Sequence, residues 1–454
     1  MTAELRRRKL KSQHVGPASK KNSKDKEASS IQRSLICLII CATILILFFG
    51  IYVDTWEMGH KAVDHLAKSL GYHEPVYAVV IDAGSTGSRV LAFSFHKAYL
   101  DGRLVLDDEL FVETKPGLSS FAKNPEKSAQ SINKLLEQAK QKIPKKYWSQ
   151  TPLTLKATAG LRLLPAHQAE DLLDAVRALF EKSLFHTTPE SVAIMDGVDE
   201  GIFSWFTVNF LLDRLSANPD RTVAALDLGG GSTQVTFAPT TPSTLKQTDY
   251  IHNVQAVKGT IPVYTHSYLG LGLMAARKEI LTYGHESDKK NLSSHCVNPF
   301  ISNKKFHYSG VDYYVSGNDA TVRGDSDPVV DFYDCTRIII DYVYSKVIPL
   351  EELHTKQINA FSYYFDRATE YGLIDPFTGG IVTVEQFMNA AKDACATINV
   401  DQPFMCLDLS YIWVLLEHGF GLKPATKLNL FKKIQGHEIS WALGAAFNIL
   451  KSNN

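Results

Sequence analysis

Apolar and polar positions alternate in blocks between residues 76 and 212, and these blocks predict strands separated by helices. Short apolar runs at Val76–Ile81, Leu153–Ala157 and Ser191–Ile194 are typical of buried strands. The helices expected around them, from apolar positions three and four residues apart, cover residues 128–142, 166–185 and 201–212. A strand-helix-strand-helix order predicts an α/β fold with a largely parallel sheet and with ligands at the carboxyl ends of its strands.

Two loops of nearly the same design follow apolar runs and lie 145 residues apart. The first loop reads Asp82-Ala83-Gly84-Ser85-Thr86-Gly87-Ser88-Arg89, and the second loop reads Asp227-Leu228-Gly229-Gly230-Gly231-Ser232-Thr233-Gln234. Further strand-like runs, 90–95 and 235–237, follow them, so each loop is predicted to be the tip of a hairpin. Glycines let backbone N–H groups turn toward an anion, hydroxyls add donors, and each leading Asp can hold a divalent cation or its waters. A plain turn explains one such loop equally well, but two facing loops would grip a polyphosphate.

Two other predicted strand ends carry charged residues with suitable chemistry. Thr158 and Arg162 follow the strand 153–157, and the guanidinium of Arg162 can bind a phosphate through two N–H groups. Glu200 follows the strand 191–194 at the start of a helix. Taken alone, a surface ion pair explains Arg162, and stabilisation of a helix dipole explains Glu200. Beside the two loops, both residues become candidates for an active site.

Charge divides the chain of 454 residues, which is long enough for two domains. Residues 1–34 hold ten Lys/Arg against three Asp/Glu, which leaves 38 of 48 basic and 45 of 48 acidic residues to the rest. Positions 34–53 carry no charge and predict a transmembrane signal anchor, with a cleaved signal peptide as the alternative. The basic tail 1–33 should stay cytosolic, so the chain is expected to be a type II membrane protein. The tail lacks interleaved aromatic residues, so no nucleic-acid partner is expected.

Four cysteines lie beyond the apolar segment, and an even number in an oxidising compartment indicates disulfides. Of the three possible pairings, proximity in sequence favours Cys296 with Cys335 and Cys395 with Cys406; free core thiols are the alternative. Asn291-Leu292-Ser293 is the only N-x-Ser/Thr sequon, and its polar surroundings predict an exposed, glycosylated loop.

Five segments, in order and spacing, resemble the apyrase conserved regions of the ectonucleoside triphosphate diphosphohydrolase family. They are residues 82–89, 156–164, 198–211, 225–237 and 435–445, and the resemblance covers the chain beyond about residue 74. It implies two RNase H-like lobes, as in actin, sugar kinases and heat-shock chaperone ATPases, with the active site in the cleft between them. The expected division is a stem at 54–75, lobe I at 76–205 completed by 437–454, and lobe II at 206–436.

The resemblance also implies a role for each candidate site residue. Glu200 matches the base that activates water, and Ser232 and Gln234 match the residues that orient it. Asp82 and Asp227 match the carboxylates that hold hydrated Ca²⁺ or Mg²⁺. The remaining matches are a phosphate clamp of Ser85, Thr86, Gly87, Thr158, Arg162, Gly229, Gly230 and Gly231, the active-site Trp441, and base-stacking candidates Tyr364, Phe365 and Tyr411.

One membrane span and Gly87 in the first loop make the chain similar to the smaller secretory-pathway members of the family. This similarity implies hydrolysis of nucleoside diphosphates such as UDP and GDP, in the Golgi or another secretory-pathway membrane, in support of glycosylation. A broad apyrase that also cleaves triphosphates is the alternative, at the cell surface or secreted after cleavage of the stem. A sugar kinase of the same superfamily and a non-catalytic nucleotide-binding membrane protein are the rivals from other classes.

Overall fold

The computed structural model describes residues 21–52, 57–215, 218–256, 259–318 and 328–452. The described residues divide into two compact units, one within residues 21–74 together with 97–105, and one within residues 75–96 together with 106–452. The smaller unit contains helix α1 (Lys21–Tyr52) and helix α2 (Glu57–Ser69). Within α1, residues 32–49 have a mean hydropathy of 2.3 and none of them is buried, so α1 has the length and composition of a membrane span.

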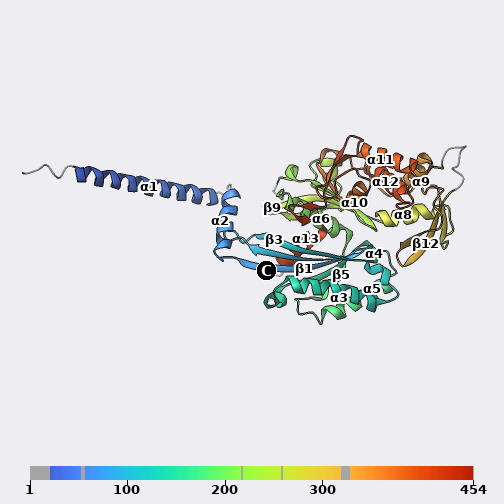
Figure 1. Cartoon of the computed structure of the whole chain (residues 1–454), viewed down its shortest axis with the longest axis horizontal. Coiled ribbons are helices and arrows are strands. Elements are labelled where there is room, and N and C mark those ends of the chain that lie inside the picture. Colours follow the sequence, from blue (N-terminus) through green and yellow to red (C-terminus); the bar gives the residue numbers. More distant parts are fainter. Residues whose placement is uncertain (1–20, 53–56, 216–217, 257–258, 319–327, 453–454) are drawn as a thin grey trace, which may run out of the picture. The chain divides into compact units, whose positions relative to one another are not determined.

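The larger unit is built on two mixed sheets (Figure 1), and these sheets share an internal strand order. The first sheet has the order β3-β2-β1-β4-β5, and the second has the order β14-β15-β13-β6-β7-β9-β8. In each sheet, the first strand along the chain pairs with the second on one side, and on its other side it runs parallel to a later strand, which is β4 beside β1 and β13 beside β6. The chain therefore contains one α/β architecture twice, and each loop connects the first two strands of its own sheet.

Strand and helix bounds of the first sheet agree with the apolar runs of the sequence. The strands are β1 (Glu74–Ala83), β2 (Ser88–Lys97), β3 (Leu104–Thr114), β4 (Leu153–Ala157) and β5 (Val192–Ile194). Helices α3 (Pro125–Lys142) and α5 (Ala166–Phe180) cover one face of this sheet, and the short helix α4 (Ala159–Arg162) follows β4 (Figure 1). Asn124 caps α3 by accepting a hydrogen bond from the N–H of Lys127, and Ile132 and Leu136 are buried in the core below.

The second sheet consists of β6 (Ala224–Leu228), β7 (Ser232–Phe237), β8 (Ile251–Ala256), β9 (Gly259–Leu269), β13 (Ile358–Ser362), β14 (Gly380–Thr383) and β15 (Lys427–Leu430). Helices α8 (Leu273–Thr282), α9 (Phe332–Tyr344), α10 (Tyr363–Glu370), α11 (Val384–Ala396) and α12 (Met405–Val414) share its large apolar core. Further elements include helix α7 (Pro242–Leu245), a small sheet of β10 (Asn291–Ser294), β11 (Lys304–Tyr308) and β12 (Val311–Gly317), and the hairpin β16 (Lys433–Ile434) and β17 (His437–Glu438).

Two helices, α6 (Gly197–Leu211) and α13 (Trp441–Ser452), pack against each other, and between them they contact both sheets (Figure 1). The ring of Phe447 on α13 contacts Phe95 of the first sheet at 5.2 Å between centroids and Phe210 on α6 at 4.6 Å. Helix α6 in turn packs on β6, β7 and β9 of the second sheet. Because α6 runs through residue 205, the predicted lobe boundary at 205 and 206 falls inside a helix and stays a prediction.

Helix α6 begins four residues earlier than its apolar pattern predicted. The side chain of Asp196 accepts a hydrogen bond from the N–H of Val198 and caps the helix, so its first turn includes Glu200. Helix α5 ends at Phe180 rather than near residue 185. Neither difference moves a site residue out of the predicted strand-end region.

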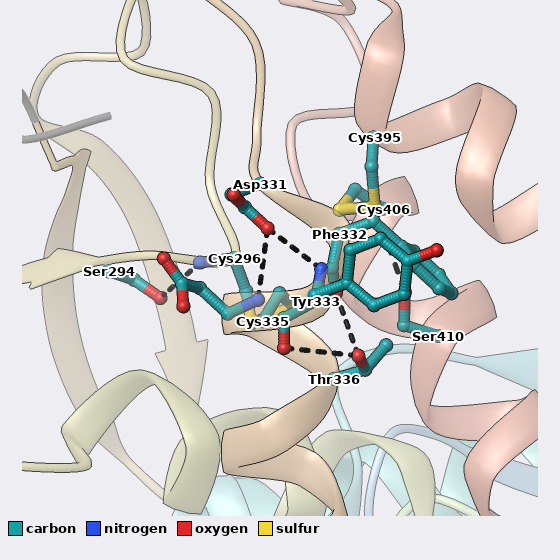
Figure 2. Close-up of a disulfide and its surroundings, with 11 residues drawn as sticks. Ser294, Cys296, Asp331, Phe332, Tyr333, Cys335, Thr336, Cys395, Cys406 and Ser410 are labelled. Carbon is teal, nitrogen blue, oxygen red and sulfur yellow. Dashed lines mark hydrogen bonds between the residues drawn. A yellow bond between two sulfur atoms is a disulfide. The ribbon is translucent and has the colours of Figure 1, made fainter. Parts of the chain in front are cut away.

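Two disulfides lie in the core of the second sheet (Figure 2). Cys296 pairs with Cys335 on α9, and Cys395 on α11 pairs with Cys406 on α12. These are the pairs that proximity in sequence favoured. Asn291, the residue of the sequon, is exposed at the start of β10. Its glycosylation stays a prediction.

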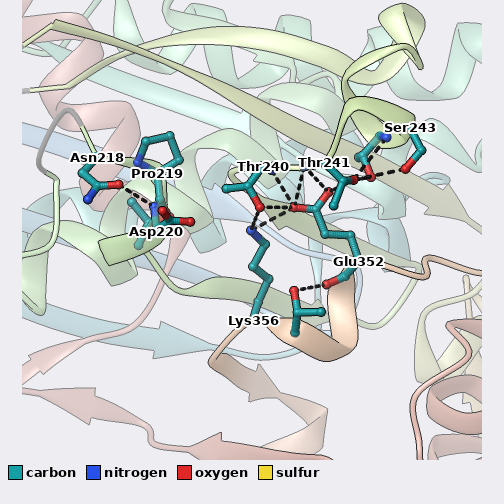
Figure 3. A network of polar contacts seen from close by, with 11 residues as sticks. Asn218, Pro219, Asp220, Thr240, Thr241, Ser243, Glu352 and Lys356 are labelled. Atoms are coloured by element: carbon teal, nitrogen blue, oxygen red, sulfur yellow. Dashed lines mark hydrogen bonds and ion pairs between the residues drawn. The ribbon is translucent and has the colours of Figure 1, made fainter.

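A polar network ties the segment after β7 to the segment before β13 (Figure 3). Glu352 accepts hydrogen bonds from the backbone N–H of Thr240 and from the hydroxyl of Thr241, and it pairs with Lys356 at 2.9 Å. Burial raises the pKa of Glu352, but the hydrogen bonds from Thr241 and Thr240 outweigh burial and lower the pKa to about 2. The carboxylate is therefore ionised at neutral pH and stabilises this connection.

Candidate active site

The two loops lie in close contact at a position where only glycine, which has no side chain, fits. A Cβ atom on Gly230 of the second loop would lie 2.3 Å from Oγ of Ser85 and 2.9 Å from Cγ2 of Thr86 in the first loop. Gly272, at the start of α8, packs closely against the backbone of the second loop. A Cβ atom on Gly272 would lie 2.4 Å from the backbone N of Gly231. The structure thus brings together two loops that are far apart in sequence.

Helix α4 approaches the first loop from the carboxyl end of β4. A Cβ atom on Gly160 would lie 2.7 Å from Cα of Ser85, and the N–H of Thr158 donates to the carbonyl of Ala83 at 3.2 Å. Because α4 lies this close to the loop, Thr158 and Arg162 fall within the same site as the loops. This is the placement that parallel strands β1 and β4 predict for residues at their carboxyl ends.

Asp82 ends β1 and is buried beside a cation. Its Oδ2 atom is 3.2 Å from Nη1 of Arg89, and Arg89 also pairs with Glu113 at 2.8 Å. Burial raises the pKa of Asp82, while the guanidinium of Arg89 and a hydrogen bond from Trp441 lower it in part. The other carboxylate oxygen, Oδ1, is buried without a hydrogen-bond partner. Such an oxygen is free to accept a hydrogen bond from a water molecule or to approach a cation.

Asp227 occupies the matching position at the end of β6. The hydroxyl of Ser362 donates to its Oδ1 at 2.6 Å, and the hydroxyl of Ser204 donates to its Oδ2 at 3.3 Å. Burial raises the pKa of Asp227 to about 6, although the hydrogen bond from Ser362 opposes this rise and Asp82 adds to it by repulsion. Each of the two carboxylate oxygens therefore has one hydroxyl partner.

Glu200, in the first turn of α6, is buried next to both aspartates. It forms an ion pair with Arg162 and accepts a hydrogen bond from Nε2 of Gln234 at 3.1 Å. Burial raises the pKa of Glu200 to about 8; Arg162 opposes this rise, and Asp227 and Asp82 add to it by repulsion. A cation held by the two aspartates would favour the ionised form of Glu200 and lower this pKa.

Gln234 links the buried acid to the second loop. Its Nε2 atom lies 2.9 Å from the hydroxyl oxygens of Ser232 and Ser267, in addition to its bond to Glu200. Its Oε1 atom is buried and has no hydrogen-bond partner. Placing Nε2 toward the carboxylate agrees with the charges, because Oε1 in that position would repel Glu200. Oε1 is therefore an unsatisfied acceptor beside the carboxylate of Glu200.

These residues suit a hydrated divalent cation. Carboxylate oxygens are the ligands that Ca²⁺ and Mg²⁺ prefer, and a cation would relieve the repulsion between Asp82, Asp227 and Glu200. Within residues 21–52, 57–215, 218–256, 259–318 and 328–452, no three His, Cys, Asp or Glu side chains converge closely enough to bind an ion directly. Water molecules would therefore complete the shell of a cation held by Asp82 and Asp227.

The three predicted base-stacking residues lie in the apolar core. Tyr364 and Tyr411 are fully buried and Phe365 is 5% exposed, so none presents a ring face to a ligand. The hydroxyl of Tyr411 donates to the carbonyl oxygen of Leu271 at 2.5 Å, which fixes it as a structural residue. Their burial argues against the base-stacking hypothesis, because stacking requires an accessible ring.

Four residues of this site were not identified from the sequence: Arg89, Ser204, Ser267 and Ser362. Ser204 lies one helical turn after Glu200, so helical periodicity alone places it on the same face. Ser362 lies at the carboxyl end of β13, and Ser267 lies directly opposite Gln234 on the neighbouring β9. Only the strand pairing, which the sequence does not reveal, brings these two serines to the site.

The sequence is similar to one protein family and to several named proteins. Residues 70–454 match the model of the GDA1/CD39 (nucleoside phosphatase) family. A human protein named nucleoside diphosphate phosphatase ENTPD5 is 42% identical over 387 residues, which cover 83% of this chain and 88% of that protein. A rat protein named ectonucleoside triphosphate diphosphohydrolase 6 is 43% identical over 390 residues, covering 84% of this chain and 83% of that one.

A solved structure shows that the fold is also shared at much lower sequence identity. The nucleoside triphosphate hydrolase of Neospora caninum superposes with a TM-score of 0.56 at 16% identity, over 87% of this chain and 97% of that one. The family model covers both loops, Glu200 and the repeated sheets. The chain belongs to the GDA1/CD39 (nucleoside phosphatase) family.

Proposed function

We propose that the protein hydrolyses the terminal phosphate of nucleoside diphosphates, with UDP and GDP preferred, and that the reaction requires Ca²⁺ or Mg²⁺. The observation that carries the proposal is the buried Glu200, joined to Gln234 beside two facing glycine-rich loops. The name of the human relative, a nucleoside diphosphate phosphatase, supports the choice of substrate. The products would be a nucleoside monophosphate and inorganic phosphate.

Binding of the diphosphate would use backbone N–H groups and one guanidinium. The second loop offers the N–H groups of Gly230 and Gly231, and the first loop offers the hydroxyls of Ser85 and Thr86. Arg162 pairs with Glu200, and its Nε atom is buried without a hydrogen-bond partner. A phosphate would give Arg162 a second anion and draw it away from Glu200.

Hydrolysis would proceed by in-line attack of water on the terminal phosphorus. Glu200 would accept the proton as the new P–O bond forms and the bond to the bridging oxygen breaks. Oε1 of Gln234, which has no partner, would accept the other hydrogen of the water and fix its orientation. A divalent cation bound at Asp82 and Asp227 would neutralise charge on the phosphates.

We further propose a site of action in the Golgi or a neighbouring secretory membrane, with the larger unit on the lumenal side. The apolar helix α1, the basic segment before it and two disulfides support this location. There the enzyme would remove diphosphates left by glycosyltransferases. Removal of this product would relieve product inhibition and support glycosylation.

Phosphate release by the detergent-solubilised full chain tests the proposal. UDP, GDP, ADP, CDP and the matching triphosphates would be compared in Ca²⁺, in Mg²⁺ and in a chelator. The proposal predicts cation-dependent release that is much faster from UDP and GDP than from triphosphates. Equal or faster cleavage of triphosphates would indicate a broad apyrase, and no release from any substrate would indicate a nucleotide-binding protein.

A further inference from the structure

Ser362, the last residue of β13, has a backbone conformation that L-residues rarely adopt. Its φ is 58° and its ψ is −127°, at the point where β13 turns into α10. Glycine adopts such angles without steric cost, and a serine does not. A serine at a strained position is expected to make a specific side-chain contact that glycine would not provide.

The contact of Ser362 is with Asp227 and not with its own helix. A serine at the N-cap, the residue just before a helix, usually accepts a hydrogen bond from a backbone N–H in the first turn. Ser362 occupies that position before α10, yet its side chain makes no capping hydrogen bond. Its hydroxyl instead donates to Oδ1 of Asp227 at 2.6 Å.

Strand pairing places Ser362 at the second loop. Strand β13 runs parallel to β6, with Phe361 opposite Asp227 and Ser362 opposite Leu228. Ser204 holds the other oxygen of Asp227 from helix α6. One hydroxyl on each oxygen restricts rotation of the carboxylate, and the bond from Ser362 is the shorter of the two.

We propose that Ser362 is a positioning residue that fixes the Asp227 carboxylate for a hydrated divalent cation. The inference rests on the proposed function, in which Asp227 helps to hold that cation. Ser362 itself remains part of the protein framework and does not touch the reacting atoms. Its hydroxyl sets the direction of the lone pairs that Asp227 offers to the water shell of the cation.

Substitutions at Ser362 and at Ser309 separate the hydroxyl from the backbone strain. Ser362→Ala removes the hydroxyl and keeps the strain, whereas Ser362→Gly removes both. Ser309 is the matched control, because it also has a positive φ of 48° and lies in the turn between β11 and β12. Ser309→Ala likewise removes a hydroxyl and keeps the strain, and Ser309→Gly removes both, at a place outside the site.

Two measurements on the full chain in detergent test the proposal. One is the shift of the unfolding midpoint with increasing Ca²⁺ without nucleotide, and the other is the cation concentration that half-activates UDP hydrolysis. Both Ser362 variants should need on the order of tenfold more cation in each measurement, the scale of one hydrogen bond to a charged group. Both Ser309 variants should respond to the cation as the unmodified protein does.

The outcomes separate this inference from the proposed function. If both Ser362 variants keep the normal cation response, or change it no more than the Ser309 variants do, the positioning role is wrong. A loss of stability in Ser362→Ala with a normal cation response would likewise leave only a structural role. If the unmodified protein releases no phosphate at any cation concentration, the proposed function fails, whatever the variants show.

Discussion

Replacement of Gly272 by alanine is expected to damage the site through the backbone of the second loop. The new Cβ would lie 2.4 Å from the backbone N atoms of Gly231 and Ser232 and 2.5 Å from the carbonyl carbon of Gly230. Ordinary contact begins at 3.4 Å, so the loop or the start of α8 must move by about 1 Å. Side-chain rotation cannot relieve the overlap, because all three atoms belong to the backbone.

The size of that movement sets the expected effects on stability and on catalysis. Overpacking of this kind lowers the free energy of unfolding by about 1–3 kcal/mol. A displacement of roughly 1 Å in groups that position the substrate lowers kcat/KM by on the order of 100-fold. We therefore expect Gly272→Ala to fold, to unfold at lower denaturant concentration, and to lose most of its kcat/KM for UDP.

Gly317→Ala is the matched control for this prediction. Its Cβ would lie 2.2 Å from the carbonyl oxygen of Asn298, also a backbone atom, but Gly317 ends β12 in the small sheet and contacts neither loop. Urea unfolding and initial rates of phosphate release would be measured for both variants. Similar losses of stability with similar losses of kcat/KM would refute the reasoning, because a general loss of packing would then explain both.

Three further predictions concern other parts of the structure. Burial raises the pKa of Glu109 from 4.5 to about 7, so the contribution of Glu109 to the free energy of unfolding falls as pH rises from 4.5 to 7. Glu109→Gln should remove this part of the pH dependence, which urea unfolding at both ends of the range would measure. Tyr411→Phe should lower the free energy of unfolding by about 1 kcal/mol, because one buried hydrogen bond is lost. The ratio of kcat/KM for UDP to that for GDP should stay unchanged, and a changed ratio would support a role of Tyr411 in base binding. Replacing Cys296 and Cys335 together by serine should cost about 4 kcal/mol in thermal or urea unfolding, since the pair closes a loop of 39 residues, and an unchanged midpoint would contradict this.

Local features of the sequence predicted the parts of the site that depend on single segments. The two loops could be found because glycines, hydroxyls and a leading aspartate follow an apolar run in each case. Glu200 could be placed near them because ligands gather at the carboxyl ends of parallel strands. The repeated strand order of the two sheets explains why the two loops have the same design.

Contacts between distant segments could not be predicted in this way. Ser267 and Ser362 come from β9 and β13, and only the register of those strands against β7 and β6 brings them to the site. The burial of Tyr364 and Tyr411 could not be predicted either, since an aromatic residue looks the same in a sequence whether its ring is buried or exposed. The early start of α6 followed from one hydrogen bond, the cap by Asp196, which apolar periodicity does not record.

Phosphate release by Glu200→Gln tests the central claim most directly. The account predicts a fall in UDP hydrolysis of about 10²–10⁴-fold, with UDP affinity little changed, because the amide fills the same space but cannot accept the proton of the water. Asp199→Asn is the matched control, because Arg162 and Gln234 bond to Glu200 and not to the neighbouring Asp199. This variant should retain normal hydrolysis. Near-normal turnover by Glu200→Gln would contradict the assignment of Glu200 as the base and the mechanism built on it.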